Sequence, residues 1–300
     1  MKAMILAAGY GTRLEPLTHK RPKALMPVAN IAMVDRVIEY LKIYGVNEII
    51  INAHHLYGQI VSHFRDQGRF DIPIHIAVEK EILGTGGGIK NVEYFWDEEP
   101  FIVINVDILT SVDLSAALEA HKQASALATL VLHDYGRFNQ VKIDLEGHIL
   151  GFVDKPGPGL LAFTGIHIMS KKVLNYIPPG TSYNILDAYR DAIAHGEIVS
   201  SFISKGHYWV DMGSPQDYIR ANREMLGSQR ILAADGAHID PSSELKGWVI
   251  IGHCVQIGPK ARLENSIVWD GVSIGQRAIV RDSIVTRDVQ AGKILVDKIY

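Results

Sequence analysis

The residues best suited to chemistry lie in one short stretch near the N-terminus, AAGYGTRLEPLTHKRPK at positions 7–23. Gly9 and Gly11 give its backbone the freedom to approach a ligand closely. Cations follow at once, among them Arg13, Arg21 and Lys23. A glycine turn with exposed N–H groups and nearby cations is typical of a phosphate site. The stretch is neither a Walker loop, because no Gly-Lys-Ser/Thr follows, nor a dinucleotide fingerprint, because the third glycine is missing.

Four further stretches carry side chains suited to phosphate, metal or sugar chemistry. ILGTGGGIKN, residues 82–91, places four glycines before an expected helix, which favours close approach to a flat or anionic ligand. Asp107 ends the apolar run VINVDIL, and Asp211 follows an aromatic and apolar pair in WVDMGSPQDY. FVDKP places an acid beside a base, Asp154 and Lys155. Any one of these alone would be typical of a surface turn.

The elements that must position these residues alternate along the first part of the chain. Apolar runs predict strands, and stretches with an apolar face predict helices, one ending at Gly45, one behind an Asp113 cap and one from Ser214-Pro215 to about Leu226. This alternation indicates an α/β, Rossmann-like fold with a mostly parallel sheet. Ligands of such sheets bind at the carboxyl ends of strands, where the 7–23 loop sits. The predicted strands are 3–8, 48–52, 74–78, 101–106 and 128–132.

The pattern changes after about residue 236, where aliphatic residues recur every six positions. One row runs through Ile239, Leu245 and Ile251, and a companion row runs through Val249 and Val255. Glycines follow the aliphatic residues at several repeats, which indicates a parallel β-helix of about three coils. We therefore expect two domains, at 1–230 and 237–296. Because the stack is short and its end is open, self-association into a homo-oligomer through it is expected.

Composition limits the class of protein. The chain has 300 residues, 47% of them hydrophobic, and a net charge of −3, which argues against a general nucleic-acid binder. We find no apolar stretch of membrane-spanning length and no secretory signal, and we expect no membrane partner. The single cysteine, Cys254, excludes an internal disulfide, fits a cytoplasmic location, and is expected to be a small buried hydrophobe.

Taken together and in this order, the motifs resemble the sugar-1-phosphate nucleotidylyltransferase family, in look closest to its mannose-1-phosphate guanylyltransferase-like members. The glycine turn with Thr-Arg-Leu, and then RPKALMPV at 21–28, look like the family signature. The resemblance covers the whole chain, since many relatives carry a left-handed β-helix after the catalytic domain. It implies an enzyme that joins a nucleoside triphosphate (NTP) and a sugar-1-phosphate into an NDP-sugar and pyrophosphate. The attacking phosphate oxygen is already ionised, so no general base is needed.

The resemblance also implies roles for single residues on the nucleotide side. Arg13 would hold the triphosphate, and Lys23 would bridge the attacking phosphate and the α-phosphate. Asp107 and Asp211 would hold Mg²⁺, a cation that takes carboxylate and phosphate oxygens. The nucleotide itself would contact Ala7, Ala8, Gly9, Gly11, Thr12, Glu79, Gly84 and Thr85.

On the sugar side the implied contacts are Gly86, Asp154, Lys155, Thr164 and Gly165. Asp154 stands where the family has Glu, which shortens its reach by one methylene. Val106 stands where the family usually has Gly before the metal aspartate. Because valine rarely adopts a left-handed conformation, we expect ordinary extended backbone at this position.

Glu79 is the residue from which the identity of the nucleotide base can be inferred. A carboxylate offers two acceptors and no donor, which suits the adjacent N1–H and N2–H₂ donors of guanine. This favours GTP and a mannose- or heptose-1-phosphate. Two alternatives remain: Glu79 pairs with Lys80 or Lys90 at the surface, or the enzyme is a uridylyl- or thymidylyltransferase acting on another sugar phosphate, such as an N-acetylated amino sugar.

Three other classes of protein are less favoured by the sequence. A catalytically inactive regulatory or scaffold relative would be expected to lose the basic or metal residues, which are present here. A glycosyltransferase would show Asp-x-Asp at the strand end, where this chain has Asn105-Val106-Asp107. An acyltransferase built on the β-helix lacks room for a separate site and offers a single candidate histidine, His253.

Overall fold

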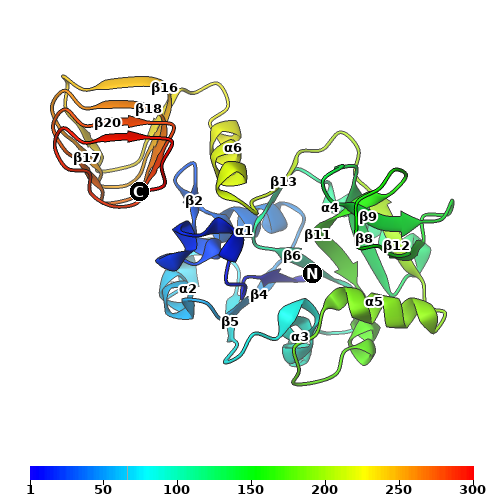
Figure 1. Ribbon diagram of the computed structural model, residues 1–300. Coiled ribbons are helices and arrows are strands. Elements are labelled where there is room, and N and C mark those ends of the chain that lie inside the picture. The colour runs from blue at the N-terminus through cyan, green and yellow to red at the C-terminus, as the bar shows by residue number, and fades with distance from the viewer. Residues whose placement is uncertain (66) are drawn as a thin grey trace. The chain divides into compact units, whose positions relative to one another are not determined.

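The computed structural model describes residues 1–65 and 67–300 and divides into two compact units (Figure 1). The first unit consists of Met1–Tyr10, Pro22–Ala24 and Val34–Asp211. The second consists of Gly11–Arg21, Leu25–Met33 and Met212–Tyr300. In this described part of the chain, no helix combines the length and the apolar character needed to cross a membrane.

Within the described residues, the first unit is built on a nine-stranded mixed sheet. Four strands run parallel in the order β5, β4, β1, β6, and β11 then joins β6 antiparallel. This α/β, Rossmann-like architecture confirms the expected fold class, and the five predicted strands are all present with ends shifted by at most two residues. The strands are β1 (Lys2–Leu6), β4 (Glu48–Ala53), β5 (Ile74–Val78), β6 (Phe101–Asn105), β8 (Ala128–His133), β9 (Asn139–Ile143), β10 (Ile149–Phe152), β11 (Leu161–Met169) and β12 (Val199–Ile203).

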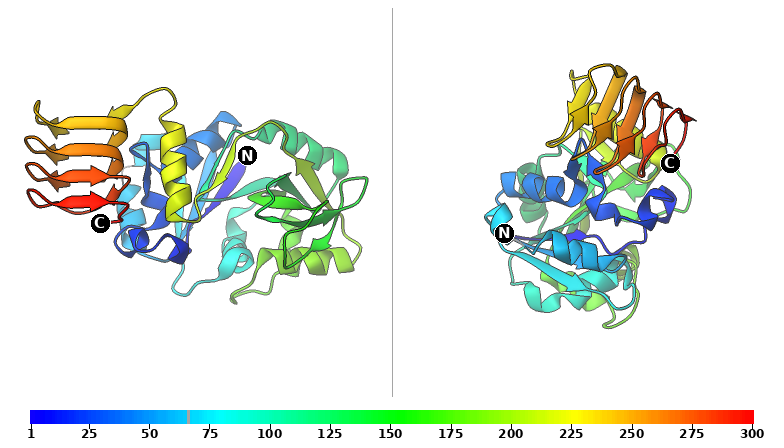
Figure 2. Two further views of the ribbon diagram at one scale, coloured as in Figure 1. Left: turned by 45° about the horizontal axis from the view of Figure 1, so that its top comes forward. Right: turned by 90° about the vertical axis from the view of Figure 1, so that its left-hand side faces the viewer.

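Helices lie on both sides of this sheet (Figure 2). The expected caps are confirmed: the Asp113 carboxylate accepts hydrogen bonds from the first turn of α4, and the Ser214 hydroxyl accepts one at the start of α6 in the second unit. These caps satisfy N–H groups that a helix cannot bond internally. The helices are α1 (Met33–Ile43), α2 (Tyr57–His63), α3 (Gly84–Asn91), α4 (Leu114–Ala124), α5 (Ile185–Ala194) and α6 (Pro215–Met225).

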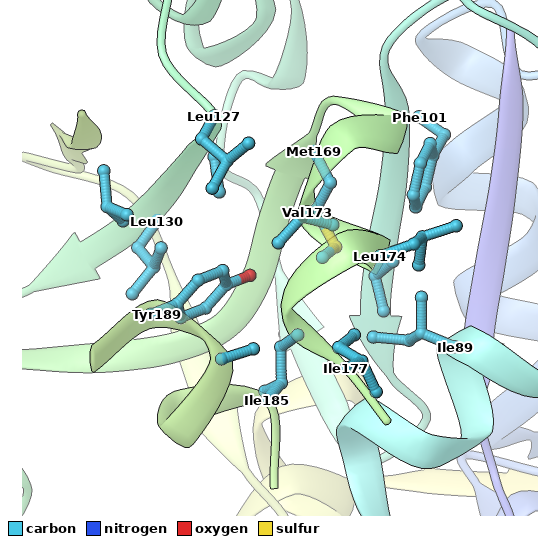
Figure 3. Close-up of a cluster of buried hydrophobic side chains, with 14 of the residues drawn as sticks. Ile89, Phe101, Leu127, Leu130, Met169, Val173, Leu174, Ile177, Ile185 and Tyr189 are labelled. Atoms are coloured by element: carbon cyan, nitrogen blue, oxygen red, sulfur yellow. The ribbon is translucent and has the colours of Figure 1, made fainter. Parts of the chain in front are cut away.

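A large apolar cluster fixes α3 and α5 on the sheet (Figure 3). Tyr189 of α5 lies among residues from β8 and the turn after β11, and Ile89 of α3 packs with the same cluster. Side chains that are buried against one another leave little freedom to the elements that carry them. The edges of the sheet that carry the candidate site are therefore firmly placed within this unit.

Parallel coils make up the C-terminal part of the second unit, as the six-residue period predicted. Leu245 on β16 pairs with Leu263 on β18, and Leu263 pairs with Val280 on β20, so one coil takes 18 residues and the next takes 17. Figure 1 shows these strands stacked one above another. The strands are β14 (Ile231–Ala233), β15 (His238–Ile239), β16 (Glu244–Ile251), β17 (Gln256–Ile257), β18 (Arg262–Val268), β19 (Ser273–Ile274), β20 (Ile279–Arg281), β21 (Ile284–Val285) and β22 (Ile294–Val296).

The glycines of the repeat are needed where neighbouring coils touch. A Cβ at Gly252 would lie 2.6 Å from Asp270 N, and a Cβ at Gly275 would lie 2.4 Å from Ala291 N. The expectation for Cys254 is wrong, because this residue is exposed and has a positive φ of 55°. It lies just before β17, and its side chain is not in the row that fills the coil.

His167 on β11 gives the first unit a measurable acid sensitivity. Its ring is 1% exposed, and its Nδ1 lies 2.5 Å from the Tyr189 hydroxyl oxygen. Burial lowers the pKa of His167 from 6.5 to about 3. Between pH 6.5 and pH 3, His167 therefore binds a proton in the unfolded chain but not in the folded chain. The free energy of unfolding falls as the pH drops through this range, and this group does not change it above pH 6.5.

We expect His167→Gln, which keeps polar atoms but does not titrate, to remove this contribution. The loss of unfolding free energy between pH 7 and pH 5 should be about 2 kcal/mol smaller in the variant than in the parent. Urea unfolding at the two pH values measures this difference. Equal losses in both proteins would show that His167 titrates normally when folded.

Candidate active site

Lys23, Asp107 and Asp211 come together just beyond the carboxyl end of β6. Asp107 is separated from β6 by Val106 alone, and β13 (Trp209–Asp211) pairs with β7 (Ile108–Thr110) so that Asp211 stands opposite Ile108. The Lys23 ammonium donates a hydrogen bond to Asp107 Oδ2, although the two residues are 84 positions apart. The side chains of this pair are only 12% and 15% exposed. Val106 has no left-handed φ, as expected.

Electrostatics keep this site charged. Burial by itself raises the pKa of Asp107, but the adjacent Lys23 ammonium, the hydrogen bond that it donates, and the hydrogen bonds shared with the Asp211 side chain and the backbone outweigh it, and the net effect lowers the pKa of Asp107 below its ordinary 3.8. Asp107 is therefore ionised at neutral pH. A carboxylate and an ammonium in so little solvent attract each other more strongly than in water.

A buried amide connects the end of β1 to the second glycine segment. Asn52, at the end of β4, accepts a hydrogen bond from Ala7 N at 2.7 Å and donates one to Glu79 Oε1 at 2.7 Å. Glu79 Oε2 accepts from Leu83 N at 3.0 Å. Asn52 and Glu79 are 2% and 3% exposed. The start of the signature loop and the turn before α3 are thus tied to one another through two side chains.

This network places Glu79 inside the protein. Each oxygen of its carboxylate accepts a hydrogen bond from the protein, and a contact of Glu79 with the base stays a prediction. The alternative surface pair with Lys90 is wrong, because Lys90 pairs with Glu93 at 2.9 Å and Glu79 is buried. The sequence could not reveal this, since both partners of Glu79 depend on how β4 and the 79–83 turn meet.

The second glycine segment lies inside helix α3 (Gly84–Asn91), whereas a glycine turn just before a helix was expected. Gly86 and Gly87 lie inside α3, and their N–H groups donate to Tyr183 O at 2.9 and 3.2 Å. A Cβ at Gly87 would lie 2.4 Å from Thr181 O. The Thr85 hydroxyl accepts from Ile185 N at 3.0 Å at the start of α5. These glycines therefore permit close contact with the 181–185 segment of the chain itself, and substrate contacts at Gly84, Thr85 and Gly86 stay a prediction.

The residues expected on the sugar side are placed in two different settings. Asp154 and Lys155 lie in an exposed turn after β10, open to a ligand. Thr164 is buried on β11, and its hydroxyl donates to Val131 O at 2.8 Å, so its contact with the sugar stays a prediction. Gly165 has a φ of 78°, and a Cβ there would lie 2.6 Å from the Asn105 side chain at the end of β6.

The signature turn at residues 11–14 belongs to the second unit. Gly11 adopts a φ of 67° directly before the short 3₁₀ turn Thr12–Leu14, which explains the need for glycine. The Thr18 hydroxyl donates to Gly11 O at 3.0 Å and holds the turn closed. Thr12 and Arg13 are exposed on it. In the first unit, Ala7 and Ala8 are buried and Gly9 is exposed.

Sequence reasoning missed three residues beside these loops. Asn52 could have been suspected, because an amide ends the otherwise aliphatic run of β4. His54 and Tyr10 form a second contact, with the His54 ring nitrogen Nε2 3.3 Å from the Tyr10 hydroxyl and Nδ1 2.9 Å from Glu79 O. Their two rings meet edge to face at 5.5 Å.

Two family models match successive parts of the chain. The Nucleotidyl transferase family model matches residues 2–228, and the GMPPB C-terminal domain model matches residues 228–296. A UTP–glucose-1-phosphate uridylyltransferase from Synechocystis is 29% identical and covers 100% of this chain and 87% of its own. A mannose-1-phosphate guanylyltransferase from Mycobacterium tuberculosis is 28% identical, with coverage of 93% and 82%.

Two shorter proteins match about three quarters of the chain. A D-glycero-α-D-manno-heptose 1-phosphate guanylyltransferase from Campylobacter jejuni is 30% identical over 73% of this chain and 97% of its own. Among solved structures, HddC from Yersinia pseudotuberculosis in complex with GMP-PN is 26% identical, with a TM-score of 0.65 over 75% of this chain and 99% of its own.

The Asn52 network generates a prediction. Asn52→Ala leaves Ala7 N and Glu79 Oε1 without their partner, and each buried unsatisfied group costs about 1–3 kcal/mol. We expect the free energy of unfolding to fall by at least about 2 kcal/mol. Urea unfolding measures the loss. Asn47→Ala is the matched control, because Asn47 accepts an exposed hydrogen bond from the Met1 amino group, and it should change stability little. Equal effects of the two variants would contradict a structural role for the network.

Proposed function

We propose that this chain, which belongs to the nucleotidyl transferase family, transfers GMP from GTP to mannose-1-phosphate or heptose-1-phosphate and releases pyrophosphate. The observation that carries the type of reaction is the buried pair of Lys23 and Asp107, with Asp211 beside it at the carboxyl end of β6. Such an arrangement supplies charge and position. Phosphoryl transfer between ionised phosphates needs those two things most.

Each residue of the site has a part in this reaction. Lys23 neutralises charge on the attacking phosphate and on the α-phosphate, so that two anions can approach each other. Arg13 holds the triphosphate and stabilises the charge that builds on the leaving pyrophosphate. The exposed Asp154 and Lys155 take the sugar hydroxyls and the sugar's phosphate. Preorganised charges of this kind lower the barrier because they need not reorient during the reaction.

Asp107 and Asp211 fit a divalent cation, which we propose is Mg²⁺. Asp107 is ionised, and β-strand pairing brings Asp211 next to it. Among the described residues, no group of three or more His, Cys, Asp or Glu could hold a metal alone. A site with two carboxylates suits Mg²⁺, which usually takes its remaining ligands from water and substrate phosphates. When bound, the cation supplies charge neutralisation on the triphosphate.

The preference for guanine is supported by the relatives and not by Glu79. Relatives named as guanylyltransferases align over both parts of the chain, and the C-terminal match is to the GMPPB C-terminal domain. The same evidence leaves a second candidate, since the uridylyltransferase from Synechocystis covers the whole chain. That candidate is a uridylyl transfer to glucose-1-phosphate. Self-association through the β-helix stays a prediction in either case.

Pyrophosphate release tests the proposal. The protein with Mg²⁺ is given GTP, UTP, dTTP, ATP or CTP, each against mannose-, heptose-, glucose- and N-acetylglucosamine-1-phosphate. We expect release with GTP and a mannose- or heptose-1-phosphate at a kcat/KM at least about 100-fold above the other pairs. Release with UTP and glucose-1-phosphate would establish the second candidate. An absence of release from every pair would favour an inactive regulatory protein.

Lys23→Ala tests the role of the ion pair. Loss of a preorganised cation should lower kcat about 100-fold or more, with Asp107 left as a buried, unpaired carboxylate. Steady-state kinetics with the best substrate pair measure kcat. Lys171→Ala is the control, because Lys171 forms a 3.0 Å pair with Glu98 at the surface and should leave kcat unchanged. Circular dichroism separates loss of activity from loss of fold, and near-normal turnover in folded Lys23→Ala would contradict the assignment.

A further inference from the structure

Two rings that the proposed reaction does not use lie after the ends of neighbouring strands in the first unit. His54 directly follows β4, and Tyr10 lies four residues after β1, between Gly9 and Gly11 of the signature loop. The two strands are paired in parallel. Because parallel strands present their carboxyl ends at one edge of a sheet, both rings stand at the edge where ligands of such folds bind.

His54 connects two segments of the chain through its two ring nitrogens. Nδ1 lies 2.9 Å from the main-chain oxygen of Glu79, and Nε2 lies 3.3 Å from the Tyr10 hydroxyl. A carbonyl oxygen only accepts hydrogen bonds, so Nδ1 carries the proton of the neutral ring. Nε2 is then an acceptor, and the Tyr10 hydroxyl donates to it. One backbone carbonyl therefore sets the direction of both hydrogen bonds.

The Glu79 end of this connection is fixed by the sheet. Glu79 N donates to Ala53 O at 2.8 Å, directly before His54 in the chain. The Glu79 carboxylate accepts from the Asn52 amide and from Leu83 N, and the residue is 3% exposed. The carbonyl that orients the imidazole thus has a well-defined position.

The Tyr10 end lies in a more open part of the chain. Tyr10 is 52% exposed, and a Cβ at Gly9 would meet no described atom within 4 Å. The Tyr10 ring contacts the edges of two imidazoles, that of His54 at 5.5 Å and that of His55 at 5.8 Å between centroids. Because glycine leaves the backbone conformationally free, these side-chain contacts restrain this part of the loop.

We propose that His54 and Tyr10 are positioning residues for the nucleoside triphosphate. The inference rests on the proposed function, which assigns the signature loop to the nucleotide. His54 joins this loop to the 79–83 segment, where a contact with the base is predicted. The pair orders the loop before the nucleotide arrives, so binding does not have to supply that ordering. Its loss weakens nucleotide binding and leaves the sugar phosphate and the chemical step unaffected.

Three substitutions interrupt this connection at defined bonds. Tyr10→Phe keeps the ring contacts and removes the hydroxyl. His54→Asn keeps an N–H donor near the place of Nδ1, so it retains the bond to Glu79 O and loses the bond to Tyr10. His54→Ala removes both bonds.

Calorimetric titration of GTP and of UTP into the full chain, with Mg²⁺ and without sugar phosphate, measures binding. We expect Tyr10→Phe and His54→Asn each to raise the Kd of the nucleotide that the parent binds more tightly by about three- to tenfold, the contribution of one hydrogen bond. The double variant should bind as each of these single variants does, since all three lack the same bond. His54→Ala should bind more weakly than His54→Asn.

Tyr176→Phe and His75→Asn are matched controls in the same unit. Each removes one exposed hydrogen bond, from the Tyr176 hydroxyl to Glu197 and between His75 and Glu48, and should leave the Kd unchanged. In steady-state kinetics, Tyr10→Phe should raise KM for the nucleotide and leave kcat and KM for the sugar phosphate within about twofold of the parent. A merely structural role would lower the free energy of unfolding and leave the nucleotide Kd unchanged.

Two results would overturn the inference while the proposed function stands. One is an unchanged Kd in Tyr10→Phe, and the other is additive losses in the double variant, which would show two independent effects. If neither GTP nor UTP bound the parent protein, the proposed function would fail and the inference with it. Because binding is measured without turnover, a failure of pyrophosphate release does not decide this test.

Discussion

The ion pair between Lys23 and Asp107 is the constraint on which the candidate site depends. Two charges that are only 12% and 15% exposed are stable when they are paired and costly when they are apart. The chain must therefore bring Pro22–Ala24 to the carboxyl end of β6, 84 residues away. The parallel order β4, β1, β6 makes this contact accessible, because strands that run the same way present their carboxyl ends at one edge.

The two glycine segments show how one residue type satisfies opposite requirements. Gly11 takes a left-handed conformation before an exposed turn, where backbone N–H groups can face a ligand. Gly86 and Gly87 have ordinary helical backbone and are buried, and they let α3 touch the chain at Tyr183. In the sequence, the first segment indicates a phosphate site, and the second favours close approach to a flat or anionic ligand. The two uses differ in what lies next to the glycine. For Gly86 and Gly87 the neighbour is the protein's own chain at Tyr183, almost a hundred residues away in the sequence.

This difference marks what could be predicted from the sequence. Patterns that one element carries alone were predictable: the strands, the Asp113 and Ser214 caps, and the coils with Leu245 stacked on Leu263. Partners chosen by long-range packing were not. Glu79 looked like an open carboxylate and is bonded to Asn52, while Cys254 looked like a core residue and lies exposed with a positive φ. Lys23, Asp107 and Asp211 were found because the family motif preserves long-range neighbours.

The same ion pair explains how a site built for anions remains stable without them. Lys23 needs a negative partner when no phosphate is present, and Asp107 provides it inside the protein. In the proposed reaction, Lys23 binds phosphate and Asp107 binds a divalent cation. Each of the two charges therefore has a second partner that arrives with the substrate. Net charge in the buried site then changes little on binding. A site of low dielectric constant can thus hold the charges needed for catalysis, because each charge is paired both in the free protein and with substrate bound.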